Sequence, residues 1–140
     1  MSDIERAKKL LNEGEYTCVL IKGQEVITSR ERGVAPLLSL LDGRGSLRGF
    51  SAADRTVGAG AAHIYVALGV DTVFARVMSD TARAVLDSAK ISHGCDLFVP
   101  VIINRRGDGT CPIEAVLSPE DTTVLAIEKI RTRLSELSGK

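Results

Sequence analysis

The sequence predicts a three-layer α/β/α sandwich whose central layer is one mixed β-sheet. Near the N-terminus, two β-rich runs flank the Gly23-Gln24 pair, which suits a tight hairpin turn and an antiparallel strand pair. Further along, strand-like apolar runs alternate with segments of helical periodicity. Strands joined by helices pair in parallel through right-handed crossovers, so the sheet is expected to combine both strand orientations, with helices on both faces.

The composition is typical of one globular domain, which we expect to cover residues 1–140. The chain is 44% hydrophobic, and 18 Lys and Arg balance 18 Asp and Glu. A chain of this length can bury a full core without a metal or a disulfide. With zero net charge, three Phe, two Tyr and no Trp, the sequence argues against extended nucleic-acid binding, which needs a basic field and stacking platforms.

We expect the chain to be cytoplasmic and its thiols to be reduced. The apolar runs are shorter than the ~20 residues that a membrane span needs, and the first residues carry acids rather than a basic leader. The three cysteines, Cys18, Cys95 and Cys111, are odd in number and widely spaced, which makes a poor disulfide framework.

Local signals place the first four elements. Ser2 precedes an amphipathic period that predicts a helix over 3–13, and the runs 16–21 and 25–29 are the expected hairpin strands. The Leu-rich run 34–41 has a proline near its first turn and predicts a short buried helix.

The rest of the chain alternates between helix and strand. The Ser51 to Asp54 segment indicates the capped start of a helix that runs to Leu68, with a face of small residues that another backbone could approach closely. The later elements are expected to be strand 72–78, helix 80–90 capped by Ser79, a run over 97–103 whose proline suggests an edge strand or a bulge, a short helix from Cys111 to Glu114, and a last helix from Ser118 to Leu137.

Four short motifs, in order along nearly the whole chain, carry a resemblance to a known fold. They are the Phe50–Gly58 segment, Met78-Ser79-Asp80, Asn104-Arg105 and Cys111-Pro112-Ile113-Glu114. In these motifs the chain resembles a small uncharacterised prokaryotic family with a cytidine-deaminase-like fold. The resemblance implies that fold, but the family has no established activity to carry over.

The same resemblance raises the question of zinc. Zinc deaminases need a His or Cys ligand with a Glu two residues later on one helix, and a Pro-Cys-x-x-Cys pair at the start of the next. The corresponding segments here, 51–54 and 79–82, offer no such set, and neither His63 nor His93 has an acid at the required spacing. We therefore expect no metal and no other cofactor, and we interpret the two histidines as a packed and a loop residue.

Cys111 and Glu114 are candidate catalytic residues. At a helix start, the positive end of the helix dipole can lower a thiol pKa, which would make Cys111 a nucleophile with Glu114 as general acid or base. The alternative is structural, because Cys-Pro-x-Glu is also the pattern of an ordinary helix start whose glutamate bonds back to the cap. The 118–121 segment repeats that pattern with no hint of chemistry.

Asp54 and Arg55 are candidates because of where the resemblance places them. Deaminase-like folds keep their pocket on that side of the domain, so Asp54 would contact a ligand or carry a proton, with Arg55 beside it. An acid in the first turn of a helix is also what the helix dipole favours, so a structural role for Asp54 stays open.

Two further pairs are candidate ligand-binding residues. Ser79 and Asp80 follow a predicted strand and begin a helix, where a hydroxyl and free amides can hold an anion or a ribose hydroxyl. A plain N-cap explains them equally well. Asn104 and Arg105 belong to the densest basic segment, where Arg105 could pair with a phosphate or with Glu114, although a solvated loop is the default interpretation.

Three functional hypotheses follow. The first is a zinc-free deaminase-like domain that binds a small ligand, such as a nucleotide or nucleoside, in a pocket built from Asp54, Ser79, Cys111 and Glu114. The second is a cysteine-dependent enzyme that uses Cys111 as nucleophile. The third is a protein-interaction module that uses a sheet edge or a helix surface, and the sequence leaves homodimer formation open.

Overall fold

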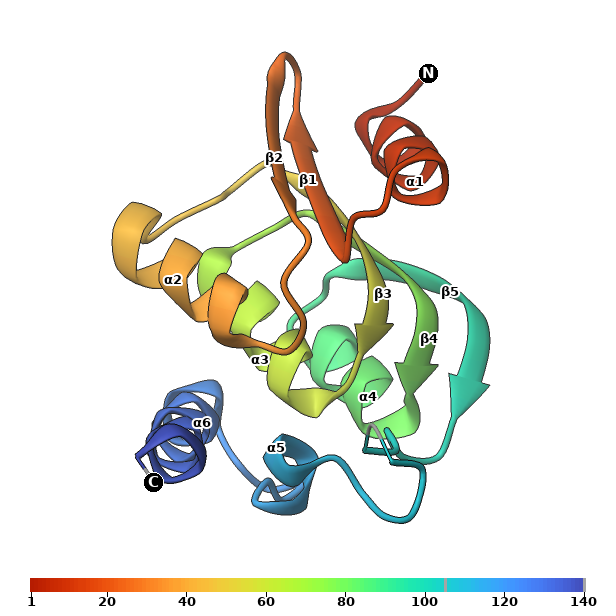
Figure 1. Ribbon diagram of the computed structural model, residues 1–140. Helices are drawn as coiled ribbons and strands as arrows, with labels where there is room; N and C mark the ends of the chain where they lie inside the picture. The colour runs from red at the N-terminus through yellow and green to blue at the C-terminus, as the bar shows by residue number, and fades with distance from the viewer. Residues whose placement is uncertain (105, 140) are drawn as a thin grey trace.

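The computed structural model describes residues 1–104 and 106–139 and contains one five-stranded sheet with six helices in the described ranges (Figure 1). In chain order the elements are α1 (Asp3–Glu13), β1 (Cys18–Lys22), β2 (Glu25–Ser29), α2 (Ala35–Arg44), β3 (Ser51–Val57), α3 (Ala59–Leu68), β4 (Thr72–Ser79), α4 (Asp80–Ser88), β5 (Ser92–Val99), α5 (Pro112–Ala115) and α6 (Thr123–Ser138).

The sheet is mixed, as predicted. Its strand order is β2-β1-β3-β4-β5. The hairpin pair β1–β2 and the pair β1–β3 are antiparallel, whereas β3–β4 and β4–β5 are parallel. The parallel strands β3 and β4 therefore end at the same edge of the sheet, which is where α3 and α4 begin.

Helices cover both faces of the sheet (Figure 1). Helix α1 lies alone on one face, where Ala7 and Leu11 pack with Val19 and Ile21 of β1. On the other face, α2, α3 and α4 enclose the larger apolar cluster, and α6 packs against the outer side of α3. The prediction of a three-layer α/β fold is confirmed.

The segment that we expected to begin a long helix is instead strand β3. Ala52 and Ala53 are fully buried in this central strand, with α3 packed over one face of the sheet and α1 over the other. Small side chains let both helices approach, and this tertiary requirement overrides the weak strand propensity of alanine. Helix α3 begins only after Gly58, so Asp54 lies in a strand rather than in a first helical turn.

Two other boundaries also differ from the predicted ones. Strand β5 begins at Ser92 and ends before Pro100, because its backbone pairs with β4 from Thr72 onward. Helix α6 begins at Thr123, since the Thr122 hydroxyl accepts a hydrogen bond from the Leu125 amide and acts as the N-cap.

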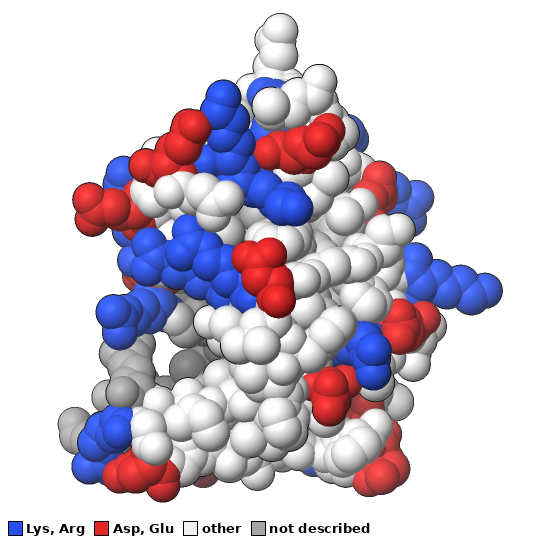
Figure 2. Space-filling view, turned by 90° about the vertical axis from the view of Figure 1, so that its right-hand side faces the viewer, with Lys and Arg blue, Asp and Glu red and all other residues white. Residues whose placement is uncertain are grey.

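Strand β5 forms one edge of the sheet, as Pro100, just beyond its end, suggested. It pairs only with β4, and Leu97 and Phe98 are 57% and 44% exposed. On the face drawn in Figure 2, basic and acidic side chains lie beside one another and an uncharged area extends below them.

Among the described residues, no helix is both long and apolar enough to cross a membrane. Cys18, Cys95 and Cys111 are not joined by disulfides.

The docking of α1 gives a direct test of the fold. Leu11 is fully buried in the cluster under this helix, so the Leu11→Ala variant should lose about 2–5 kcal/mol of unfolding free energy. Leu137→Ala, at a position 45% exposed, should change it by less than about 1 kcal/mol. Urea unfolding monitored by circular dichroism measures both, and equal losses would contradict the arrangement.

Candidate functional site

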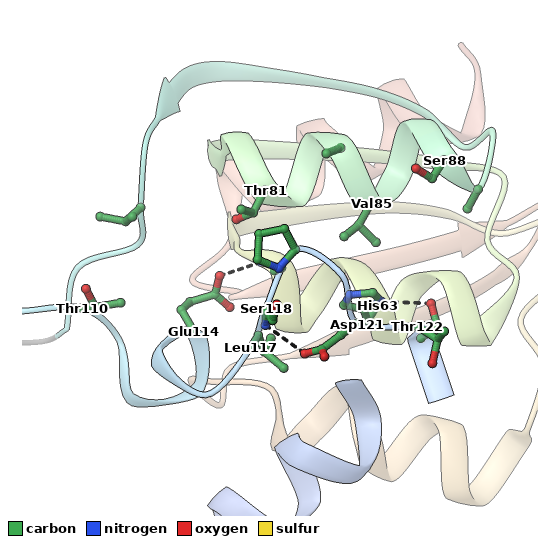
Figure 3. Close-up of a pocket in the computed structure, with 16 residues that line it drawn as sticks. His63, Thr81, Val85, Ser88, Thr110, Glu114, Leu117, Ser118, Asp121 and Thr122 are labelled. Carbon is green, nitrogen blue, oxygen red and sulfur yellow. Dashed lines mark hydrogen bonds between the residues drawn. The ribbon is translucent and has the colours of Figure 1, made fainter. Parts of the chain in front are cut away.

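Two cavities flank the N-terminal end of α3. The larger, of about 720 Å³, is lined by residues from β1, β3, α3, α5 and α6, from the segment 31–37, and from residues 102–104 and 106. The smaller, of about 500 Å³, lies among α3, α4 and the 110–123 segment (Figure 3). Glu114 lines both, so its carboxylate stands between the two cavities.

The larger cavity brings together most of the residues that the sequence singled out. They are Asp54, Arg55, Asn104, Cys111 and Glu114. Ser79 and Asp80 line neither cavity. Ser79 is fully buried and its hydroxyl caps α4 by accepting a hydrogen bond from the Ala82 amide at 3.1 Å, which is the structural alternative weighed for it. Arg105 lies outside the described residues.

Asp54 is a buried carboxyl on the wall of the larger cavity. The Tyr65 hydroxyl donates to its Oδ2 at 2.6 Å, and the Thr56 amide donates to its Oδ1 at 3.3 Å. Burial raises the pKa of Asp54 from its ordinary value of 3.8 to about 6, and the hydrogen bonds from Tyr65 and Thr56 only partly offset that effect. The group can therefore change charge near neutral pH.

Cys18 and Tyr65 complete this polar cluster, and sequence inspection missed both. Cys18 is the register partner of Asp54 on the neighbouring strand, and burial followed by the charge of Asp54 raises the pKa of its thiol. Burial also raises the pKa of the Tyr65 hydroxyl. The pairing of β1 with β3 brings Cys18 beside Asp54, and the packing of α3 brings Tyr65. No local sequence signal gives strand register or helix packing, so the sequence alone does not reveal the cluster.

The Glu114 carboxylate caps α3 rather than its own helix. Its Oε1 accepts from the Ala59 amide at 2.7 Å and its Oε2 accepts from the Gly60 amide at 2.9 Å. Helix α3 has no side-chain cap of its own, so Glu114 satisfies amides that would otherwise lack a partner and interacts with the positive helix end. The expected bond from Glu114 back to the cap of its own helix is therefore wrong, and the carboxylate instead links two elements more than 50 residues apart.

Cys111 and Asn104 have largely local surroundings. Cys111 is the N-cap residue of α5, which has only four residues, so its helix dipole is small and gives little reason for an activated thiol. The Asn104 side chain accepts hydrogen bonds from the Gly107 and Asp108 amides and donates to the Asp108 carboxylate. Asn104 thus holds its own loop together, which agrees with the interpretation of this segment as a solvated loop.

The smaller cavity contains a second polar cluster, around His63 (Figure 3). His63 is 5% exposed, so it is the packed histidine that the sequence suggested, and its Nδ1 lies 2.9 Å from the Thr123 hydroxyl. Burial lowers the pKa of its imidazole, although the charge of Asp121 partly opposes this. Within the described ranges, no group of three or more His, Cys, Asp or Glu side chains could hold a metal ion.

The contact between Gly58 and Glu114 predicts a steric effect. A Cβ on residue 58 would lie 2.6 Å from the Glu114 carboxyl carbon, which two amide hydrogen bonds hold in place. Gly58→Ala should therefore cost about 1–3 kcal/mol of unfolding free energy. Gly43→Ala, inside α2 with no neighbour within 4 Å, should instead stabilise the chain by about 0.5–1 kcal/mol.

A double-mutant cycle measured by urea unfolding separates this clash from a general effect on α3. In a Glu114→Ala background, the Gly58→Ala change should cost less than about 0.5 kcal/mol. A full cost in both backgrounds would show that the carboxylate is not what restricts residue 58.

The raised pKa of Asp54 predicts a change of stability with pH. Between 3.8 and about 6, the folded chain keeps a proton that the unfolded chain releases, so stability falls as the pH rises through this range. Between about pH 4 and pH 7, the wild type should lose roughly 3 kcal/mol of unfolding free energy through this group, and Asp54→Asn should not. The unfolding free energy of the variant should therefore rise by that amount relative to the wild type across this range. Urea unfolding of both proteins at several pH values tests this. His63 contributes equally to both proteins, so its effect cancels in the difference between their unfolding free energies. A pH-independent difference would be the contrary result.

Comparisons with known proteins support the fold and identify the family. The family model described as "TM1506: Domain of unknown function (DUF1893)" matches residues 6–134. The crystal structure of a DUF1893 family protein (TM1506) from Thermotoga maritima is similar to this chain with a TM-score of 0.84 at 24% identity, covering 97% of this chain and 91% of that one. No curated protein matches. The chain belongs to the DUF1893 family, a domain of unknown function.

Proposed function

We propose that this protein is a zinc-free, cytidine-deaminase-like domain that binds a small ligand, such as a nucleotide or nucleoside, in the larger cavity. The observation that carries the proposal is the buried Asp54 carboxyl on the wall of a cavity of about 720 Å³. That volume lies within the range of small-molecule sites, about 300–1,000 Å³, and a buried group with a shifted pKa is a frequent mark of such sites.

The lining of this cavity suits a ligand that has both a ring and a charged group. Apolar side chains from α2, α3, α5 and α6 offer a surface for a flat ring, among them Leu37, Ala61, Ile113 and Leu134. Arg32, Arg55 and Arg106 also line the cavity, and guanidinium groups pair well with phosphate oxygens. A nucleotide would use the apolar side chains, Asp54 and the arginines together. Its base would pack against the apolar wall and form a hydrogen bond with Asp54, and its phosphate would lie near an arginine.

The proposed lack of zinc rests on the chemistry of the helix starts beside the cavity. Because residues 51–57 form a strand, the helices that begin beside the cavity are α2, at Val34-Ala35-Pro36, α3, at Gly58-Ala59-Gly60, and α5, at Cys111-Pro112-Ile113. The starts of α2 and α3 carry no His, Cys or Glu, and the α5 start offers a single thiol, Cys111, without the second Cys of a Pro-Cys-x-x-Cys pair. The carboxylates nearby already accept hydrogen bonds, Glu114 from α3 amides and Asp54 from Tyr65. These residues do not fit the ligand set of a zinc deaminase.

Ligand binding can be tested with matched aspartate variants. Cytidine, uridine, CMP and AMP are screened by thermal shift, and a compound that binds the native state should raise the melting temperature. Asp54→Asn should weaken its affinity by about tenfold or more, because a neutral amide replaces the buried acid. Asp80→Asn, outside both cavities, should leave the affinity unchanged. No shift with any of the four compounds, or equal loss in both variants, would contradict the proposal.

The affinity of a ligand that donates a hydrogen bond to Asp54 should also depend on pH. With a pKa of about 6 in the free protein, the carboxylate form is in the minority at pH 5 and predominates at pH 7. A ligand that requires this form should bind about tenfold more tightly at about pH 7 than at about pH 5. Calorimetric titration measures the change, and Asp54→Asn should abolish it. An unchanged affinity across this range would mean that the ligand does not contact the ionised acid.

The cysteine-dependent alternative keeps one supporting observation, which is that Cys111 and Asp54 line the same cavity. Under the binding proposal, Cys111→Ala should preserve ligand affinity within about threefold, because the thiol is only part of the wall. Calorimetry on this variant, together with iodoacetamide labelling of the wild type, separates the two. Fast labelling at Cys111 alone and loss of turnover in the variant would favour the enzyme.

A further inference from the structure

The smaller cavity offers recognition groups that the proposed function does not use. It lies between α3, α4 and the 110–123 segment (Figure 3). Glu114 lines both this cavity and the Asp54 cavity. Its walls mix apolar side chains, such as Val85 of α4 and Leu117, with the hydroxyl groups of Thr81 and Ser88. This mixture suits a compact ligand with an apolar body and a few hydrogen-bonding atoms.

His63 is the buried polar group of this cavity with spare hydrogen-bonding capacity. Its side chain lines the cavity although the residue is 95% buried from solvent, because only 5% of its surface is exposed. One ring nitrogen, Nδ1, is engaged by the Thr123 hydroxyl at 2.9 Å. The other, Nε2, has no hydrogen-bond partner among the described residues. It also does not belong to the described side-chain atoms that are both unpartnered and fully shielded from solvent, so a probe can reach it. A ligand in the cavity can therefore pair with Nε2.

The charged groups around His63 are already paired. The Asp121 carboxylate accepts from Lys129 Nζ at 2.9 and 3.0 Å and from the Ser118 amide at 2.8 Å. Glu114 accepts from two amides of α3. No Lys or Arg belongs to the described lining of this cavity, so an anion would find no counter-charge and a cation would compete with existing partners. The electrostatics favour an uncharged ligand.

We propose that the smaller cavity is a second binding site, distinct from the Asp54 cavity, for an uncharged ring compound that carries a hydrogen-bonding group. The ring packs against Val85 and Leu117, and the polar edge pairs with Nε2 of His63. The imidazole serves as donor or acceptor according to its tautomer, and the Thr123 hydroxyl can pair with Nδ1 in either tautomer. The site needs no residue of the Asp54 cavity except the shared wall formed by Glu114.

The charge requirement can be tested with one ring in two charge states. Nicotinamide is neutral, and nicotinate is an anion of nearly the same shape. The chain has two histidines, so ¹⁵N-histidine labelling gives one set of ring signals for His63 and one for His93. Nicotinamide titrated to about 50 mM should shift the His63 signals in a saturable way, and nicotinate should bind at least about tenfold more weakly. Neutral uracil serves as a second ring probe.

Matched variants assign the effect to this cavity. His93→Phe should leave nicotinamide binding unchanged, because the His93 Nε2 already pairs with Asp87 and the residue lies outside both cavities. Val85→Phe, which fills the cavity from α4, should abolish binding even if His63→Phe fails to fold. Asp54→Asn should have no effect, which separates this proposal from the one for the larger cavity.

Three results would overturn the second site. The first is the absence of any His63 shift with nicotinamide or uracil at the highest concentration. The second is equal binding of nicotinamide and nicotinate, and the third is nicotinamide binding that survives Val85→Phe.

Discussion

The contact between the Glu114 carboxylate and the first amides of α3 organises this molecule. It joins the 110–123 segment to the helix that follows the central strand, across more than 50 residues of sequence. It also fixes the wall between the two cavities, since Glu114 lines both. The glycines on either side of Ala59 are consistent with this role, because a Cβ at position 58 or 60 would meet Glu114 or the neighbouring Ile113.

This arrangement places the chain's own carboxylate at a helix N-terminus that could otherwise attract a ligand anion. Helix N-termini bind anions through free amides and a favourable dipole, and here Glu114 satisfies both interactions. In the proposal for the larger cavity, ligand recognition then falls to the buried Asp54 and the lining arginines. In the proposal for the smaller cavity, it falls to the imidazole of His63.

The fold class could be predicted from sequence because its signals are local. The hairpin turn at Gly23, the start of α1 after Ser2, and the Ser79 cap of α4 all appear where expected. Strand β3 could not be predicted, because alanine has a weak strand propensity. Its alanines fit this strand because helices pack closely on both faces of the sheet, which no local pattern shows.

The candidate site was predictable only in part for the same reason. Asp54, Cys111 and Glu114 carry chemistry that a sequence pattern can suggest, and they do line one cavity. Their true partners are distant in sequence: Cys18 reaches Asp54 through strand register, and Ala59 and Gly60 bind Glu114 across the fold. Ser79 shows the opposite case, in which a plausible ligand group is used by its own helix cap.

The central claim is that Asp54 is the recognition group of a ligand-binding cavity. Carbon-13 NMR of the Asp54 carboxyl, titrated against pH with and without saturating CMP, tests it most directly. The account predicts a pKa of about 6 in the free protein that falls when the ligand is bound, because a donor from the ligand stabilises the carboxylate. An ordinary pKa in the free protein, or a titration curve that CMP leaves unchanged, would contradict it.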